Sequence, residues 1–378
     1  MSRDCLRPGV RSQEGAGCLV YNSRTTLFAV PFDLGSLETR GTAVPVVDDV
    51  ANDSTNGSGH FDVTRAGTLV YRRARSGAPA MRTLQWVDPA GRREPLLAKP
   101  GAYQNPRLSP AGTRVALTVV EGNSQDLWVY DLQRDAMTRL TFGGGNDNFP
   151  TWSPDGHYIV FTTTGGGLFQ VRADGANQPQ DLTHTNITQN PWSFTPDGKR
   201  LAYYDRSDRQ IWTVPLDDQG GQLKAGTPEP FLKSRFDDRA PSFSPDGRWL
   251  AYQSNESGRD EVYVRPYPPA SSGGGTWQIS NSGATVPRWS RNGHELLYQS
   301  GDQIMAASYT VKGDTFVAEK PRVWIATLGG AEWDVAPDDT RVAVVTPVES
   351  ADAATQEHEV VFLENFVDEL RRRAPLGK

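Results

Sequence analysis

Five pairs of residues occupy equivalent places in this sequence, each shortly before a proline, and four of the pairs are strongly polar. The pairs are Gln104-Asn105, Asp147-Asn148, Gln189-Asn190, Asp238-Arg239 and Thr285-Val286. Amide, carboxylate and guanidinium groups donate and accept hydrogen bonds, so such a set is a candidate for binding a partner. The alternative interpretation is a solvated rim that binds no partner.

The residues that usually carry catalysis do not form a known constellation in this sequence. Gly57-Ser-Gly59 belongs to a Gly/Ser-rich stretch and is not the Gly-x-Ser-x-Gly turn of a hydrolase. The sequence contains no phosphate-binding loop, kinase loop or dinucleotide fingerprint. We therefore expect a non-catalytic protein. The alternative is an enzyme, either a hydrolase or lyase or the non-catalytic part of a larger kinase or peptidase.

Metal-binding patterns are equally weak, so we expect no metal and no cofactor. The segment Gly143–Asn148 is rich in oxygen ligands but lacks the regular Asp spacing and the distal Glu of a calcium loop. Cys5 and Cys18 both lie near the N-terminus. The five histidines are far apart in the sequence and form no His-x-x-x-His pair: His60, His157, His184, His294 and His358.

Composition excludes several classes of partner. The net charge of −6 and a longest basic run of only Arg371–Arg373 argue against nucleic-acid binding. No apolar run approaches the length of about 18 residues that a membrane span needs, and no signal peptide is visible at the start. The 36 aromatic residues exclude a disordered chain, and 37 Gly with 27 Pro predict many turns.

The elements that position the polar pairs are given by a repeat. Ser153-Pro-Asp-Gly156 recurs as Thr195–Gly198 and Ser244–Gly247, with weaker copies elsewhere. The turn positions are residues 67, 112, 156, 198, 247, 293 and 339, separated by 42 to 49 residues. Proline presets φ, Ser and Asp bond nearby backbone, and Gly accepts a left-handed conformation, so each copy predicts a tight turn. Recurrence also makes the Asp residues turn formers, because a catalytic acid is needed only once or twice. The aromatic residue of a sialidase Asp-box is missing after the Gly.

Each repeat predicts four short antiparallel strands. A large apolar residue such as Trp152 or Trp289 stands four positions before the turn glycine. Apolar residues alternate after the turn, as in Ile159 and Phe161, which indicates a second strand. Two further apolar segments complete a unit of about 40–45 residues, which is the size of one propeller blade. The Trp and Phe side chains are expected to fill the wedge between blades.

The sequence therefore predicts an all-β fold, a β-propeller of four-stranded antiparallel blades over residues 19–363. Seven blades are favoured, because an N-terminal strand could complete the last blade; eight would leave two blades with three strands. Residues 1–18 are expected to be ragged, and residues 364–378 to form a short helix, Glu364–Arg373, and a tail. In this ring the five polar pairs surround one mouth of the central channel.

The turns Pro150–Gly156 and Pro241–Gly247, each followed by an Ile/Leu-rich strand, resemble the WD40-like propeller repeats of TolB. The resemblance covers residues 60–345 and implies the propeller fold, a protein or peptide partner at the channel mouth and a location outside the cytoplasm.

More narrowly, Thr26–Asp33 and Asn365–Arg372 resemble the propeller halves of membrane-anchored bacterial serine/threonine kinases. Those proteins carry a kinase domain and a membrane helix ahead of the propeller. A sequence that opens in mid-blade is expected if this chain is a fragment of such a protein. We expect a monomeric recognition or sensor module whose binding residues are the polar pairs.

Overall fold

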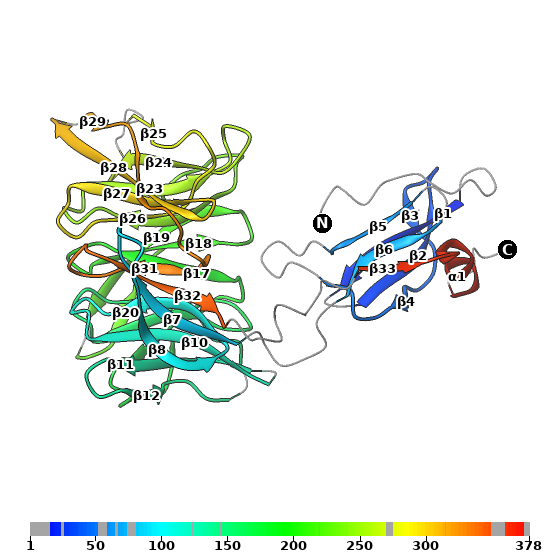
Figure 1. The fold of residues 1–378 in the computed structure, drawn as a ribbon, viewed down its shortest axis with the longest axis horizontal. Coiled ribbons are helices and arrows are strands. Elements are labelled where there is room, and N and C mark those ends of the chain that lie inside the picture. Colours follow the sequence, from blue (N-terminus) through cyan, green and yellow to red (C-terminus); the bar gives the residue numbers. More distant parts are fainter. Residues whose placement is uncertain are drawn as a thin grey trace. The chain divides into compact units, whose positions relative to one another are not determined.

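The computed structural model describes residues 16–23, 26–51, 59–64, 67–73, 81–122, 124–143, 145–218, 220–269, 275–313, 315–348 and 360–373. The chain divides into two compact units, one from residues 1–78 and 349–378 and the other from residues 79–348 (Figure 1). In the part of the chain that the structure describes, no helix is long and apolar enough to cross a membrane.

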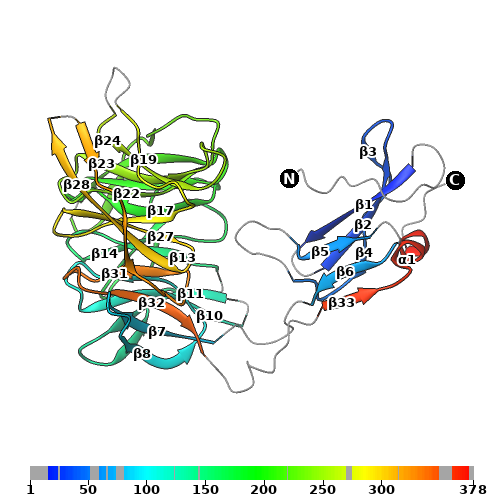
Figure 2. The ribbon, with the colours of Figure 1, turned by 45° about the horizontal axis from the view of Figure 1, so that its top comes forward.

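The larger unit contains six antiparallel sheets, and five of them follow the chain in order (Figures 1 and 2). Blade 2 consists of β9 (Tyr103–Leu108), β10 (Arg114–Glu121), β11 (Ser124–Asp131) and β12 (Ala136–Arg139), and blade 3 of β13 (Asn148–Trp152), β14 (Tyr158–Thr162), β15 (Leu168–Arg172) and β16 (Gln180–Asp181). Blade 4 consists of β17 (Gln189–Phe194), β18 (Arg200–Asp205), β19 (Gln210–Asp218), β20 (Leu223–Ala225) and β21 (Glu229–Pro230). Blade 5 consists of β22 (Asp238–Phe243), β23 (Trp249–Ser254), β24 (Glu261–Pro266) and β25 (Trp277–Gln278), and blade 6 of β26 (Thr285–Trp289), β27 (Glu295–Ser300), β28 (Gln303–Lys312), β29 (Thr315–Ala318) and β30 (Arg322–Ile325).

Blade 1 is assembled from both ends of this unit. Its inner strands are β31 (Trp333–Val335) and β32 (Val342–Pro347), and its outer strands are β7 (Arg82–Val87) and β8 (Arg93–Gly101). Strand β32 pairs antiparallel with β7 over six residues. The start of the unit thus completes the sheet that its end begins, which is how a propeller ring can be closed by backbone hydrogen bonds.

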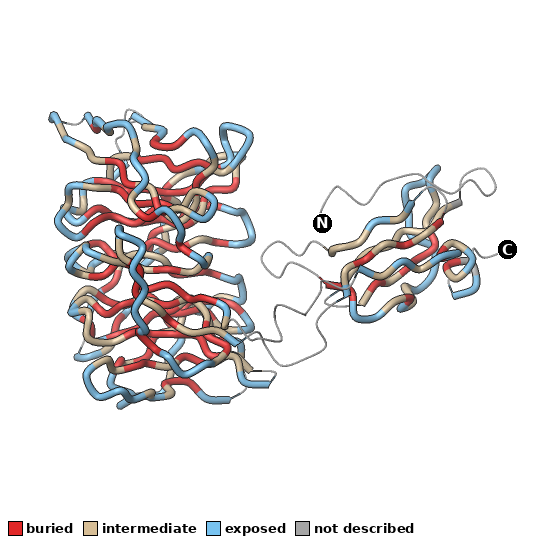
Figure 3. Tube along the Cα trace, viewed as in Figure 1, coloured by how far each residue is buried: buried red, intermediate tan, exposed pale blue. Residues whose placement is uncertain are grey.

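The six sheets form a closed ring. Each of the inner strands β9, β13, β17 and β22 contacts the inner strand of the next blade, ending with β26, and β31 contacts β9. The remaining junction is filled by Leu297 and Ile304 of blade 6, packed with Val342 and Val344 of blade 1. Figure 3 shows that buried residues follow the strands, whereas the connecting loops are mostly exposed.

The predicted all-β propeller with four-stranded antiparallel blades and a short C-terminal helix is confirmed, but the predicted count of seven blades is wrong. The ring has six blades and lies within residues 79–348 rather than 19–363. The error arose at Phe61–Gly67, which resembles a blade start. Its strands β5 (Phe61–Val63) and β6 (Leu69–Arg72) pair instead with β33 (Val360–Leu363).

The smaller unit places these three strands beside a second sheet and the helix. That sheet contains β1 (Ala16–Ser23), β2 (Thr26–Asp33), β3 (Glu38–Thr39) and β4 (Val44–Val47), and the helix is α1 (Phe366–Arg373). Leu27, Leu69 and Phe366 are fully buried in the shared core. Residues 1–18 were predicted to be ragged. Of these, residues 1–15 lie outside the described residues, and residues 16–18 belong to β1.

The aromatic residues of the inner strands fill the wedges between blades, as predicted. Trp152 packs with Leu127 and Val129 of blade 2 and with Ile159 of its own blade 3. Its indole Nε1 donates a hydrogen bond of 2.9 Å to the carbonyl oxygen of Arg107 in blade 2. Trp289 repeats this bond to the carbonyl of Ser242 at 2.9 Å. Each Trp therefore joins two blades by packing and by one directed bond.

The Ser-Pro-Asp-Gly segments are tight turns whose carboxylates serve the backbone. Ser153 Oγ bonds Asp155 at 2.5 Å and accepts the Tyr158 N–H at 3.0 Å, and Asp155 accepts the His157 N–H at 2.9 Å. Gly156 has a φ of +71°. The same bonds recur around Thr195, Ser244 and Ser290. The interpretation of the repeated aspartates as turn residues is therefore confirmed.

Candidate functional site

In three of the predicted pairs, the side chain of the first residue is buried and hydrogen-bonded to neighbouring side chains. Asp147 bonds Thr141 and Thr163, Gln189 accepts a bond of 2.8 Å from the Thr183 hydroxyl, and Asp238 accepts one of 2.5 Å from the Ser234 hydroxyl. These three side chains, Asp147, Gln189 and Asp238, are at most 7 % exposed. Burial raises the pKa of both aspartates. Their role in the structure is to fix the loops that lead into the inner strands.

The residue after each of these lies on the opposite side of the strand, because side chains alternate along a strand. These residues are Asn148, Asn190 and Arg239. The same place in the repeat is taken by Gln104 and Thr285, which are the first residues of their own pairs. Each of the five stands near the start of an inner strand. In four of the strands it comes just ahead of a register shift at which Asn105, Phe149, Ala240 and Val286 take a positive φ. The recurring bulge gives these four strands the same local bend at the channel mouth, whereas β17 shifts register later, between Pro191 and Ser193.

Two of the predicted residues contact each other across blades. Asn105 Nδ2 donates a hydrogen bond of 2.6 Å to Asn148 Oδ1, which also accepts one of 3.0 Å from Thr118. Asn148 in turn donates to Gln125 at 3.1 Å. Arg239 instead pairs with Asp260 of its own sheet at 2.7 Å. Among the described residues, no side-chain hydrogen bond or ion pair joins Gln104, Asn190 or Thr285 to the other predicted residues.

Blade 1 contributes a residue to this mouth that was missed in the sequence. Glu332 occupies the place equivalent to Asn105 and accepts the Asn105 backbone N–H. Its other carboxylate oxygen accepts a bond of 3.0 Å from Arg82, which also donates to the Tyr103 carbonyl at 3.3 Å. The signal was hidden because the copy of the repeat at residues 333–339 is weak and because Arg82 lies far away in the sequence.

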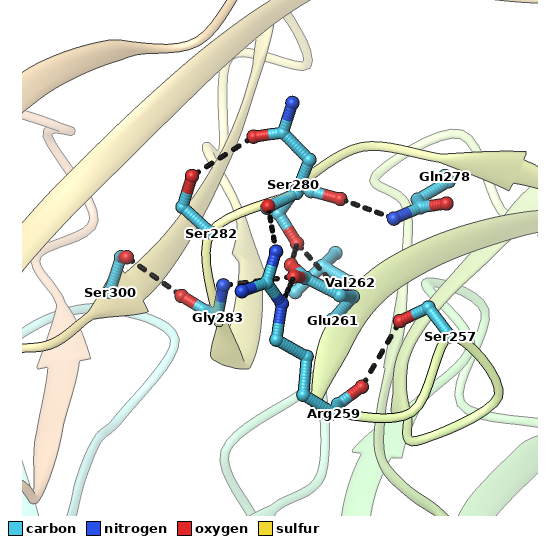
Figure 4. Close-up of polar contacts among 10 residues, drawn as sticks. Ser257, Arg259, Glu261, Val262, Gln278, Ser280, Ser282, Gly283 and Ser300 are labelled. Atoms are coloured by element: carbon cyan, nitrogen blue, oxygen red, sulfur yellow. Dashed lines mark hydrogen bonds and ion pairs between the residues drawn. The ribbon is translucent and has the colours of Figure 1, made fainter.

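The loops that carry the mouth residues are pinned to the third strand of the preceding blade, as Figure 4 shows for blade 5. The fully buried Glu261 accepts bonds from Arg259 Nε at 2.8 Å and from the Gly283 N–H at 2.9 Å. Ser280 bonds Glu261 at 2.5 Å and accepts the Val262 N–H at 2.8 Å. Gly283 lies two residues before Thr285, so this network fixes where β26 starts.

Further along the inner strands, two arginines meet one tryptophan in the channel. Arg107 of blade 2 and Arg288 of blade 6 place their guanidinium carbons 5.5 and 5.2 Å from the ring centre of Trp192 in blade 4. Asp334 of blade 1 lies 3.5 Å from Arg288 Nε and accepts the Leu108 N–H at 2.8 Å. The contacts join non-adjacent blades, so they cross the channel.

The surroundings lower the pKa of both arginines. Burial and the neighbouring Arg107 lower the pKa of Arg288 to about 9, against the attraction of Asp334. Burial likewise lowers the pKa of Arg107, with Asp334 and Glu332 acting in the opposite direction. The sequence does carry a signal for this cluster. Three blades have a charged residue at the position where the other three have Thr151, Ser193 and Ser242.

The histidines contribute nothing to the channel. His157 and His294 are exposed at strand starts, as expected, and His157 Nδ1 lies 3.3 Å from Asp155 in its turn. His60 and His184 lie elsewhere in the described structure, and His358 lies outside it. Across the described ranges, no group of three or more His, Cys, Asp or Glu residues is placed to hold a metal ion. Gly144 of the oxygen-rich segment and Cys5 also lie outside the described residues.

Comparisons with known proteins agree with this architecture. The TolB beta propeller domain family matches residues 68–229. The chain is 29% identical over 196 residues to the Tol-Pal system protein TolB of Francisella tularensis, covering 50% of this chain and 43% of that protein. It is 25% identical over 159 residues to an uncharacterized peptidase, YuxL, of Bacillus subtilis, covering 42% of this chain and 22% of that protein. The chain thus spans about half or less of the length of these curated relatives.

A solved structure described as a candidate TolB from Agrobacterium tumefaciens superposes with a TM-score of 0.52 at 18% identity. The superposition covers 72% of this chain and the whole of that one. At this identity the likeness speaks for the fold alone, and it agrees with the ring of inner strands, turns and closing blade described above. The six-bladed ring of this chain is therefore a TolB-like β-propeller.

Proposed function

We propose that this propeller is a recognition module that binds an extended peptide or protein segment at the channel mouth, without catalysis of its own. The observation that carries the proposal is the chemistry of the mouth. Neutral amides and a hydroxyl dominate it, namely Gln104, Asn105, Asn148, Asn190 and Thr285, and the bond between Asn105 and Asn148 joins two blades.

Side-chain amides suit this role because each offers a donor and an acceptor, as a peptide group does. Asn190 is 7 % exposed, and its Oδ1 has no hydrogen-bond partner within the part of the chain that the structure describes. Arg239 and Glu332 add charge at separate blades, and each already holds an ion pair. Binding through such a surface would rest on hydrogen bonds to the backbone of a partner more than on its net charge.

The test is a peptide display library selected on the purified protein, followed by affinity measurements on enriched peptides. The triple variant Gln104→Ala, Asn190→Ala, Thr285→Ala should weaken binding at least about tenfold, since each lost hydrogen bond costs on the order of 1 kcal/mol. The matched control removes three exposed polar side chains on outer turns: Gln133→Ala, Asn177→Ala and Gln178→Ala. Equal affinity of both triple variants would overturn the proposal.

A second candidate function is that of a propeller accompanying a peptidase, which the match to the Bacillus subtilis protein favours. In that case the channel would guide peptides without cleaving them. Enriched peptides left intact after prolonged incubation agree with either role, whereas cleavage by the purified chain would support catalysis here. An association with a membrane-anchored kinase stays a prediction from the resemblance, as do a monomeric state and a location outside the cytoplasm.

A further inference from the structure

The arginine–tryptophan cluster of the channel offers hydrogen-bond donors that the protein leaves unused. Arg107 Nε, Arg288 Nη2 and Trp192 Nε1 are buried and have no hydrogen-bond partner among the described residues, whereas Arg288 Nε lies 3.5 Å from the Asp334 carboxylate. The hydrogen bonds that these arginines make come from Nη1, to the carbonyls of Pro106 at 2.9 Å and Pro287 at 3.4 Å. Buried donors of this kind are rare and costly in proteins, so a cluster of three calls for a function.

The cluster also has an excess of positive charge. The ionised side chains joined here are three guanidiniums, from Arg82, Arg107 and Arg288, and two carboxylates, from Glu332 and Asp334. Three positive and two negative charges leave one positive charge. Arg288 is only 8 % exposed, so water screens that charge poorly. Arg107 is half-buried, which leaves the cluster open to solvent on its side of the channel.

We propose that Arg107, Arg288 and Trp192 form a binding site for a single carboxylate group inside the channel. The free Nη2 of Arg288 belongs to a guanidinium, the group that arginine uses to bind carboxylates through charge-assisted hydrogen bonds. Trp192 and Arg107, which contact this cluster from two other blades, each supply one unused N–H. One bound negative charge also balances the one excess positive charge.

The carboxylate could belong to a small organic acid or to a peptide, either at its C-terminus or on an acidic side chain. All three share the chemistry that the cluster recognises. The inference concerns the channel interior and does not depend on peptide binding at the mouth, because a free carboxylate tests it.

The probe is sodium acetate, titrated by isothermal calorimetry and by thermal melting against sodium chloride at equal ionic strength. Acetate should bind and raise the melting temperature, because a ligand that binds the folded state alone stabilises it. Arg288→Met should weaken acetate binding at least tenfold. Trp192→Phe keeps an aromatic face for the two arginines and removes the indole N–H with its five-membered ring, so it should fold and weaken binding several-fold.

The matched control is Arg341→Met. Arg341 also stacks on a tryptophan, with its guanidinium carbon 4.2 Å from the ring centre of Trp86, and its Nε also lacks a hydrogen-bond partner among the described residues. This variant should keep full acetate affinity. The same acetate response in the parent protein, Arg288→Met and Trp192→Phe would overturn the proposal. So would the absence of any acetate response in the parent protein, since the arginines would then only plug the channel.

A peptide arm separates the sources of the carboxylate. Peptides with a free C-terminus and no acidic side chain are compared with their C-terminal amides. A loss of affinity on amidation assigns the site to a peptide terminus, whereas equal affinity together with acetate binding assigns it to a small acid or an acidic side chain. Failure of peptide binding with intact acetate binding would count against the proposed function and leave this site standing.

Discussion

Single residues at equivalent places in the repeat divide into those that hold blades together and those that we propose to bind a ligand. Trp152 and Trp289, four positions before their turn glycines, belong to the first kind, because their indole N–H groups bond the preceding blade. The arginines one position earlier, Arg107 and Arg288, belong to the second kind, because Arg107 Nε and Arg288 Nη2 have no hydrogen-bond partner among the described residues. Neighbouring positions on one strand thus serve opposite purposes, as the alternation of side chains allows.

Replacing Trp152 separates its packing from its hydrogen bond. Trp152→Ala should lower the free energy of unfolding by about 3–5 kcal/mol, because it leaves a cavity between blades 2 and 3. Trp152→Phe should cost about 1–2 kcal/mol, since Phe194 shows that a phenyl ring fits the equivalent place but cannot reach the Arg107 carbonyl. Urea unfolding measures both values. Equal losses for the two variants would contradict this account.

Asp238 makes stability depend on pH in a direction that the structure sets. Burial raises its pKa above the ordinary value of 3.8, so folding favours the protonated carboxyl. The resulting stabilisation is fully present below the unfolded-state pKa and is lost as the pH rises through the folded-state pKa. Compared with Asp238→Asn, the parent protein should lose stability as the pH rises above the ordinary carboxyl pKa of 3.8.

The control is a carboxyl whose contribution to the free energy of unfolding depends on pH in the opposite direction. The bond from Arg172 lowers the pKa of Asp174 to about 2, so the contribution of Asp174 is lost as the pH falls. Urea unfolding of the parent protein, Asp238→Asn and Asp174→Asn on both sides of the ordinary carboxyl pKa of 3.8 gives the comparison. If Asp238→Asn shows the same pH dependence as the parent protein, the carboxyl is not the buried group described here.

At the scale of elements, the repeated turn joins neighbouring blades as well as neighbouring strands. A Cβ added to Gly112 would lie 2.8 Å from Pro337 of blade 1, and one added to Gly156 would lie 3.7 Å from Pro110 of blade 2. Both glycines have a φ of +71°. The two turns therefore share the same backbone demand and differ in how closely the next blade approaches.

These two glycines form a matched pair for a stability test. Gly156→Ala should cost about 1–2 kcal/mol, which is the cost of a left-handed conformation in a residue that has a Cβ. Gly112→Ala should cost clearly more, since the proline ring of blade 1 must also move. Thermal or urea unfolding of both variants decides the matter. An equal cost would mean that the blade contact contributes nothing.

Local sequence predicted most strands but not the assignment of every strand to a sheet. The Ser-Pro-Asp-Gly turns and alternating apolar residues identify the strands of blades 2 to 6, because those signals lie within each repeat. Strands β7 and β8 carry no such turn, and their partners lie some 250 residues away in the sequence. The hairpin of β5 and β6 resembles a blade start, yet its partner is β33. Pairing over such distances leaves little trace in a single sequence.

The candidate site was predictable only where its signals lie within a single repeat. Repeat spacing placed the polar pairs at the starts of inner strands, but it did not show that Asp147, Gln189 and Asp238 bond within the sheets. The arginine–tryptophan cluster required the ring itself, because Arg107, Trp192 and Arg288 come from three non-adjacent blades.

On the scale of the whole molecule, the account depends on the way the ring closes. Six blades within residues 79–348 leave the remaining residues to a separate unit with its own core. The closure rests on the pairing of β32 with β7, in which Thr346 lies opposite Thr83 and the two hydroxyl oxygens are 3.3 Å apart. A ring of seven blades would place these two strands in different sheets.

The most direct test of this closure is a pair of cysteines, Thr83→Cys with Thr346→Cys, in a protein whose Cys5 and Cys18 are replaced by serine. Residues directly opposite each other on antiparallel strands have Cα atoms about 4.5–5.5 Å apart, which a disulfide spans without distortion. Mild oxidation followed by peptide mapping should show residues 83 and 346 joined. Two free thiols in the folded protein after oxidation would contradict the six-bladed ring.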